Sequence, residues 1–137
     1  MTNKMIKGTQ YIEIVKRYFS FLEEEFHFEI FNEKIFGSAF FDVEYKDKER
    51  VVSISYENIE DYFLVIIFIL QNGKKPDYDD KTRTINLHKL NATILTKLDK
   101  NQMILNNNYF LKFTAENETE RKILKSAKEL RLCLKNL

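Results

Sequence analysis

Residues Val51 to Leu70 read VVSISYENIEDYFLVIIFIL, two β-type segments separated by a short acidic turn. The second segment, Tyr62 to Leu70, is an unbroken apolar run rich in β-branched and aromatic residues. Alternate side chains of a strand point to opposite sides of the sheet, so a strand of this composition is typically covered on both faces. We therefore expect it to lie within a sheet, with the rest of the chain packed over it.

The segments before this strand alternate between apolar and polar residues, with the period of two that is typical of half-buried strands. In residues 38–46 one face carries Ala39, Phe41, Val43 and Tyr45, and the other carries Ser38, Phe40, Asp42, Glu44 and Lys46. In the next segment Val52, Ile54 and Tyr56 share a face opposite Ser53, Ser55 and Glu57. With a looser strand at 28–32, a turn at Gly37 and a charged turn at 46–50, the pattern predicts an antiparallel meander.

Amphipathic helices flank this meander. After a lead-in at residues 1–8, a helix should begin near Thr9, whose hydroxyl can accept a hydrogen bond from a free backbone N–H. Its apolar residues recur at helical spacing as far as Phe26: Tyr11, Ile14, Val15, Tyr18, Leu22 and Phe26. A final helix should begin after Asn117, since Asn117 and Glu120 match a capping box. Its buried stripe would be Ile123, Ala127, Leu130 and Leu134.

The segment between the long strand and the final helix is less regular. Asn72-Gly73 predicts a turn, residues 82–86 an edge strand, residues 87–98 short helical turns and residues 106–108 another turn. The remaining structure of residues 99–113 stays open. We predict one α+β domain over residues 1–137, with an N-terminal helix, an antiparallel meander of about four to five strands and a C-terminal helix packed on one face.

Composition narrows the classes of function. The chain has 22 basic and 21 acidic residues, so its net charge of +1 gives no field that would attract nucleic acid or an anionic membrane. The longest apolar run is far shorter than the roughly 20 residues of a membrane helix. The single cysteine, Cys133, and the absence of a signal-type N-terminus favour the cytoplasm. An excess of Lys, Asn, Ile and Phe indicates a bacterial source.

Motifs for metal or nucleophilic chemistry are weak. The acidic loop at residues 77–80 fails as a calcium loop, because Thr82 replaces the required glycine and His88 replaces the bidentate glutamate. His27 and His88 have no partner at metal-ligand spacing. Cys133 lies between two leucines, which favours a structural thiol. We therefore expect no metal, no cofactor and no enzymatic activity.

Two other functions can be built on the polar face of the meander. A small hydrolase could use Asp42, Glu44 and Glu57 as paired carboxylates, although a solvated sheet face explains these residues more simply. A nucleic-acid-binding sheet would stack bases on aromatic residues such as Phe40. Asp42 and Glu44 on the same face repel phosphate, however, which argues against nucleic acid as a partner.

The apolar strand creates a mismatch with its neighbours. Both faces of residues 62–70 are apolar, so one helix layer leaves a face that residues 87–113, a second copy of the chain or another protein must cover. We expect a protein partner, either a co-encoded protein or a second copy. The expected partner-binding surface comprises Phe40, Asp42, Glu44, Ser53, Ser55, Glu57, Glu60 and Asp61.

The order of elements carries a resemblance. A helix, a charged exit reading LEEEF at 22–26, an antiparallel meander and a terminal helix resemble small bacterial immunity proteins of polymorphic toxin systems. Residues 126–134, reading SAKELRLCL, are similar to the ending of an uncharacterised family of small Bacteroidetes-like proteins. Immunity proteins bind and block a toxin and need no catalytic residues, and neither resemblance identifies a functional residue here.

Overall fold

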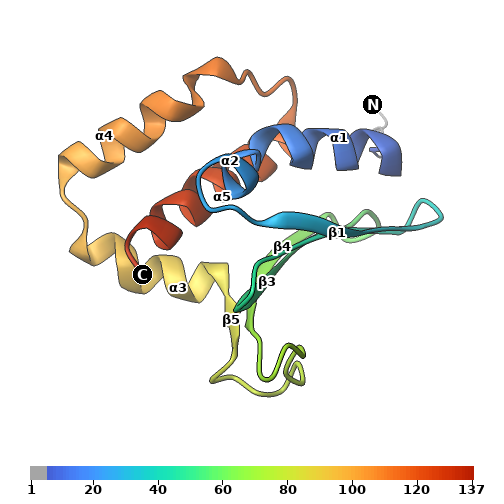
Figure 1. Ribbon diagram of the computed structural model, residues 1–137. Helices are drawn as coiled ribbons and strands as arrows, with labels where there is room; N and C mark the ends of the chain where they lie inside the picture. The colour runs from blue at the N-terminus through green and yellow to red at the C-terminus, as the bar shows by residue number, and fades with distance from the viewer. Residues whose placement is uncertain (1–5) are drawn as a thin grey trace.

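The computed structural model describes residues 6–137, so most of the lead-in expected at residues 1–8 lies outside the described residues. The fold is α+β, as predicted. Five antiparallel strands form one sheet in the order β1-β2-β3-β4-β5, and the helices gather on one side of it (Figure 1). The strands are β1 (Glu29–Phe36), β2 (Phe40–Lys46), β3 (Arg50–Glu57), β4 (Tyr62–Ile69) and β5 (Thr84–Asn86).

The apolar strand predicted at residues 62–70 is β4, which has a neighbouring strand along each of its two edges. It pairs with β3 along its whole length, and Ile66 to Phe68 pair with the short edge strand β5. The turns predicted at Gly37 and Asn72-Gly73 are confirmed, because all three residues have positive φ angles. Positive φ is accessible to glycine and, less readily, to asparagine, so these residues suit tight hairpin turns.

The helix layer contains α1 (Gly8–Tyr18), α2 (Phe21–Glu24), α3 (Leu87–Ile94), α4 (Lys100–Tyr109) and α5 (Glu118–Lys135). Helices α1, α3 and α5 pack on the sheet, whereas α4 packs on α5 and forms an outer layer in Figure 1. The main core joins the inward face of the meander to this layer. Its fully buried members include Tyr11, Phe41, Ile54 and Ile123.

The N-terminal helix differs from the prediction. It ends at Tyr18, and a separate turn, α2, follows. Phe19 and Phe21 are fully buried, as is Leu22. One straight helix would point some of these side chains away from the core, and the break turns all three inward. The helix is also capped at Lys7 rather than Thr9, and the Lys7 backbone N–H donates to Gln10.

The C-terminal half contains one confirmed cap and one wrong prediction. Asn117 Oδ1 accepts a hydrogen bond from the Glu120 N–H at 2.9 Å and so begins α5 as predicted. The turn expected at residues 106–108 is instead part of α4, which Asp99 caps through the Gln102 N–H. Asn106 is 2% exposed and hydrogen-bonds to α5, and these contacts outweigh the preference of asparagine for turns.

Candidate functional site: the open face of the sheet

We call the side of the sheet opposite the helices the open face, and strand register arranges its side chains in rows. The row at the hairpin tips, termed the tip row, pairs Phe36 with Phe40, Phe40 with Glu57, and Glu57 with Tyr62. The next row contains Lys34, Asp42, Ser55 and Leu64, and the one after it Asn32, Glu44, Ser53 and Ile66. The predicted sharing of one face by Phe40, Asp42, Glu44, Ser53, Ser55 and Glu57 is confirmed.

Glu44 is not solvated as expected, since only 2% of its surface is exposed. Three side chains close over its carboxylate: Asn32 donates at 3.1 Å, Lys34 lies at 3.4 Å and Lys75 at 2.5 Å. Lys75 comes from the β4–β5 loop and passes 5.0 Å from the centre of the Phe68 ring. Burial raises the pKa of Glu44, but the hydrogen bond and charge of Lys75, helped by Lys34, outweigh burial and hold this pKa below its ordinary value.

Asp42 is also buried, at 5% exposure, and accepts a hydrogen bond from Ser53 Oγ at 2.8 Å. Its pKa is shifted in the opposite direction to that of Glu44. Burial raises the pKa of Asp42, and the charge of Glu44 raises it further, against the opposing effect of the Ser53 hydrogen bond and the two lysines. Two neighbouring carboxylates on one strand therefore differ in their affinity for a proton.

The hydrolase hypothesis requires the three carboxylates to converge. Glu57 belongs to the tip row and lies one row beyond Asp42. A hollow on this part of the molecule is lined by other residues, among them His27, Phe31, Lys46, Val51, Leu70 and Lys75. None of the three carboxylates lines it. The raised pKa of Asp42 is a property that an acid catalyst needs. Glu57 lies in a different row, so it does not supply the second carboxylate that the hydrolase hypothesis requires.

The open side of β4 is covered by a segment that the sequence did not indicate. Val51, Ile66 and Phe68 form a small apolar cluster with Leu64 and Leu70. The loop after β4 reaches this cluster, because the Lys75 ammonium lies 5.0 Å from the centre of the Phe68 ring. Tyr78 of the same loop lines a hollow that Ile66 shares with Leu90 and Thr93 of α3. The cover suggested for residues 87–113 is wrong, since Leu87, Ile94 and Phe110 pack into the main core on the helix side.

The exposed apolar surface of the open face lies instead at the hairpin tips. Phe36 is 59% exposed and Tyr62 55%, and the Phe36 and Phe40 rings pack with centroids 5.9 Å apart. Ile59, in the β3–β4 turn, is 75% exposed. Phe36, Ile59 and Tyr62 were missed by sequence reasoning. The register of the hairpin could have identified Phe36, because Phe36 and Phe40 flank the Gly37 turn and must face each other.

Asn58 fixes the two hairpin tips relative to each other. Its side-chain amide donates to the Ser38 carbonyl at 2.7 Å and to the Ile6 carbonyl at 3.0 Å, and its backbone N–H donates to Ala39 at 2.9 Å. Asn58 is 7% exposed, so water does not compete strongly for these bonds. The backbone of the tip row is therefore held in place by these hydrogen bonds.

Glu60 and Asp61, the remaining two residues of the expected surface, both lie in the β3–β4 turn but differ in their contacts. Glu60 is exposed there. Asp61 has a positive φ angle and turns toward the helix layer, where it accepts hydrogen bonds from Tyr56 and Lys122. The Lys122 hydrogen bond lowers the pKa of Asp61, as does that of Tyr56. Asp61 therefore ties β4 to α5 and does not belong to the open face.

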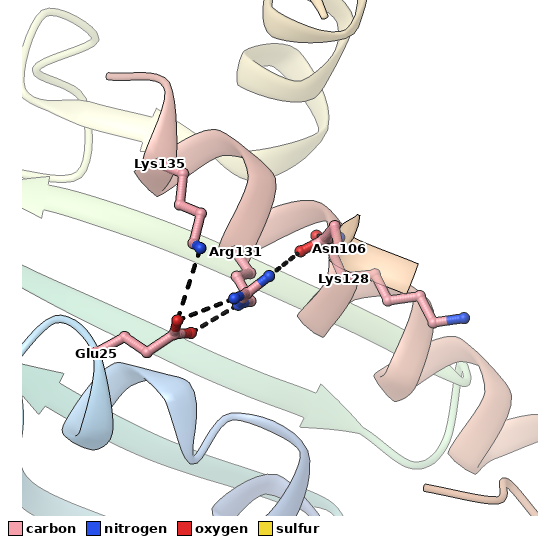
Figure 2. A network of polar contacts seen from close by, with 5 residues as sticks. All are labelled: Glu25, Asn106, Lys128, Arg131 and Lys135. Carbon is pink, nitrogen blue, oxygen red and sulfur yellow. Dashed lines mark hydrogen bonds and ion pairs between the residues drawn. The ribbon is translucent and has the colours of Figure 1, made fainter. Parts of the chain in front are cut away.

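A second polar cluster lies inside the helix layer. Figure 2 shows Arg131 on α5 reaching Glu25 with two nitrogens and Asn106 on α4 with a third. The Arg131 guanidinium also lies 4.0 Å from the centre of the Tyr109 ring. Arg131 is 6% exposed, and its contacts join α2, α4 and α5 to one another.

The residues considered for metal or thiol chemistry do not form a metal-binding cluster among residues 6–137. Within residues 6–137, no group of three or more His, Cys, Asp or Glu side chains is placed to hold a metal ion. Cys133 is fully buried, and burial raises the pKa of its thiol to about 11. A thiol with this pKa is a poor nucleophile at neutral pH.

The fold and the open face together define an α+β protein in which helices cover one face of the sheet, and the exposed apolar surface of the other face lies at the hairpin tips. No protein-family model matches the chain, and no curated protein or solved structure was found to be similar to it. In the part of the chain that the structure describes, no helix has the length and apolar character needed to span a membrane.

Proposed function

We propose that this protein is a non-enzymatic binding module that docks a protein partner on the tip-row end of its open face. The observation that carries the proposal is the pair of exposed aromatic residues, Phe36 and Tyr62, on a sheet face that no helix covers. Exposed aromatic residues on a fixed backbone are typical of interface anchors, because they bury a large area at little cost in conformational entropy. Asn58 supplies the fixed backbone.

The immunity-like layout supports the same proposal. A protein that acts by blocking a co-encoded toxin requires a preformed surface and no catalytic group. We place such a complex in the bacterial cytoplasm, because the single cysteine suits a reducing compartment.

A second apolar surface competes with the tip row. Helix α4 and the turn after it expose Leu105 and Leu111 at 68% and 75%. Helix α4 contacts the rest of the fold mainly through α5, whereas Asn58 ties the tip row to the Ile6 and Ser38 carbonyls. We favour the tip row, and the experiment below separates the two surfaces.

The proposal is tested by calorimetric titration of the protein against each product of its neighbouring genes. One product should bind, and the double variant Phe36→Ser/Tyr62→Ser should weaken that binding at least about tenfold. The control Leu105→Ser removes an equally exposed apolar residue from α4 and should leave binding unchanged. Binding by none of the products, or binding that only Leu105→Ser weakens, would overturn the proposal.

The hydrolase is retained as the alternative because burial raises the pKa of Asp42, which suits a general acid. Purified protein assayed with chromogenic esters and glycosides, beside the Asp42→Asn variant, tests it. Turnover that disappears in Asp42→Asn would favour the hydrolase over the binding module.

A further inference from the structure

We propose that the tip row binds an arginine side chain presented by the protein partner. This inference rests on the proposed docking function and adds the chemical group that the surface selects. It follows from the position of one carboxylate among aromatic rings and from the absence, among residues 6–137, of a cation paired with it.

The geometry places Glu57 between two aromatic residues. It faces Phe40 on β2 and Tyr62 on β4 in the strand register. Facing residues on adjacent strands have Cβ atoms about 4.5–5.5 Å apart, so a side chain bound to the carboxylate also touches the flanking rings. Phe36 extends the aromatic surface beyond Phe40.

The charge of Glu57 has no partner among residues 6–137, the part of the chain that the structure describes. Two nearby carboxylates have lysine partners: Glu44 pairs with Lys34 and Lys75, and Asp61 pairs with Lys122. Among residues 6–137, no lysine or arginine lies within ion-pair distance of Glu57. Glu60, exposed in the adjoining turn, adds a second negative charge. The tip row therefore presents an acidic and aromatic surface, and a cation is its complement.

A guanidinium fits this surface better than an ammonium does. It is planar, stacks on aromatic faces and forms a two-pronged hydrogen bond to a carboxylate, whereas lysine acts as a strongly hydrated point charge. The same protein contains such an arrangement in its interior, where Arg131 donates two hydrogen bonds to Glu25 and stacks on the Tyr109 ring. A phosphate-bearing ligand would be repelled by Glu57 and Glu60.

The test is an NMR titration of the ¹⁵N-labelled protein with three capped tripeptides, acetyl-Leu-X-Leu-amide, in which X is arginine, lysine or citrulline. Citrulline keeps the shape of arginine and lacks its charge. The arginine peptide should shift the amide signals of Phe40, Glu57 and Tyr62 and bind at least about fivefold more tightly than the citrulline peptide. The lysine peptide should fall between them.

Two variants sharpen the assignment. Glu57→Gln should lower the affinity of the arginine peptide to that of the citrulline peptide. Glu60→Gln should keep most of the preference for the arginine peptide over the citrulline peptide, because Glu60 lies outside the tip row. The spectra of both variants show directly whether the fold is retained. Equal binding of the arginine and citrulline peptides, shifts confined to another surface, or no shift in the tip row would overturn the inference.

Failure of this inference can be distinguished from failure of the proposed function. If the neighbouring-gene partner is weakened by Phe36→Ser/Tyr62→Ser and unaffected by Glu57→Gln, the docking surface stands and the arginine anchor is wrong. If neither variant affects the partner, the docking surface itself is wrong.

Discussion

Arg131 and Glu25 form a bidentate ion pair, with nitrogen–oxygen distances of 2.6 and 2.9 Å, although 106 residues separate them in the sequence. The pair joins the C-terminal helix α5 to the short turn α2, and Asn106 connects it to α4 (Figure 2). The hydrogen bond from Arg131 is the main influence that lowers the pKa of Glu25. Three parts of the helix layer therefore depend on one guanidinium.

Replacing Arg131 should destabilise the fold strongly. In Arg131→Met, Glu25 keeps only Lys135 as a partner, at 3.6 Å, and Asn106 loses a donor, so we expect a loss of about 2 kcal/mol in the free energy of unfolding. Urea denaturation followed by circular dichroism measures it. The matched control is Arg121→Met, which breaks the exposed pair with Glu118 on the same helix and should cost less than about 0.5 kcal/mol. Equal losses in the two variants would contradict the assigned role of Arg131.

Asn106→Ala should release α4 locally. Asn106 accepts a hydrogen bond from Arg131 and donates one to the Lys128 carbonyl, and both bonds are lost in this variant. Amide hydrogen exchange in α4 should accelerate at least about tenfold, while exchange in β3 changes little, since α4 contacts α5 rather than the sheet. Asn107→Ala, at an exposed position of the same helix, is the control. Uniform acceleration across the whole protein would contradict a local release.

Lys75→Met should destabilise the protein in a pH-dependent way. The lowered pKa of Glu44 means that its ionised form stabilises the fold above its ordinary pKa of 4.5, and that this contribution is lost as the pH falls through the lowered value. Without Lys75, only Asn32 and Lys34 remain to offset the burial of Glu44. The stability difference between the native protein and the variant should therefore be largest near pH 7 and shrink below about pH 4.5.

Denaturant titrations across this pH range measure the Lys75 effect. Lys48→Met removes an exposed lysine of the neighbouring turn and should show no such pH dependence. In the Glu44→Gln background, Lys75→Met should lower the free energy of unfolding much less, because the carboxylate that pairs with Lys75 is absent. A difference that is constant with pH would rule out Glu44 as the partner on which Lys75 acts.

Gly8→Ala should destabilise the start of α1, although alanine is the better helix former. A Cβ at Gly8 would lie 2.8 Å from Ile35 Cγ2 and 3.0 Å from Phe41 Cε1. Ile35 is half-exposed and can move, whereas Phe41 is buried, so we expect a net loss of about 1–2 kcal/mol in thermal or urea unfolding. Thr9→Ala should change stability by less than about 0.5 kcal/mol, because Thr9 is exposed and does not cap the helix. A larger effect at Thr9 than at Gly8 would contradict this packing.

The sequence by itself determined the strands of residues 38–70, the turns between them and their two faces, but it predicted the first strand only at 28–32, whereas β1 runs from Glu29 to Phe36. Alternation at residues 38–57, the glycine and Asn-Gly turns and the Asn117 cap are local signals, and each acts within a few residues of the chain. The sequence therefore correctly grouped Phe40, Asp42, Glu44, Ser53, Ser55 and Glu57 on one face. It could not show which of these residues stay in contact with solvent.

The tertiary structure alone decided burial, charge pairing and the position of the exposed surface. Lys75 buries Glu44 across 31 residues of chain, and Asn58 sets the tips at which Phe36 and Tyr62 are exposed. The helix break after Tyr18 and the helical state of Asn106 were likewise decided by packing against distant elements. Such contacts join residues far apart in the sequence, so their energies depend on the folded positions of both partners and leave no periodic signal in either segment.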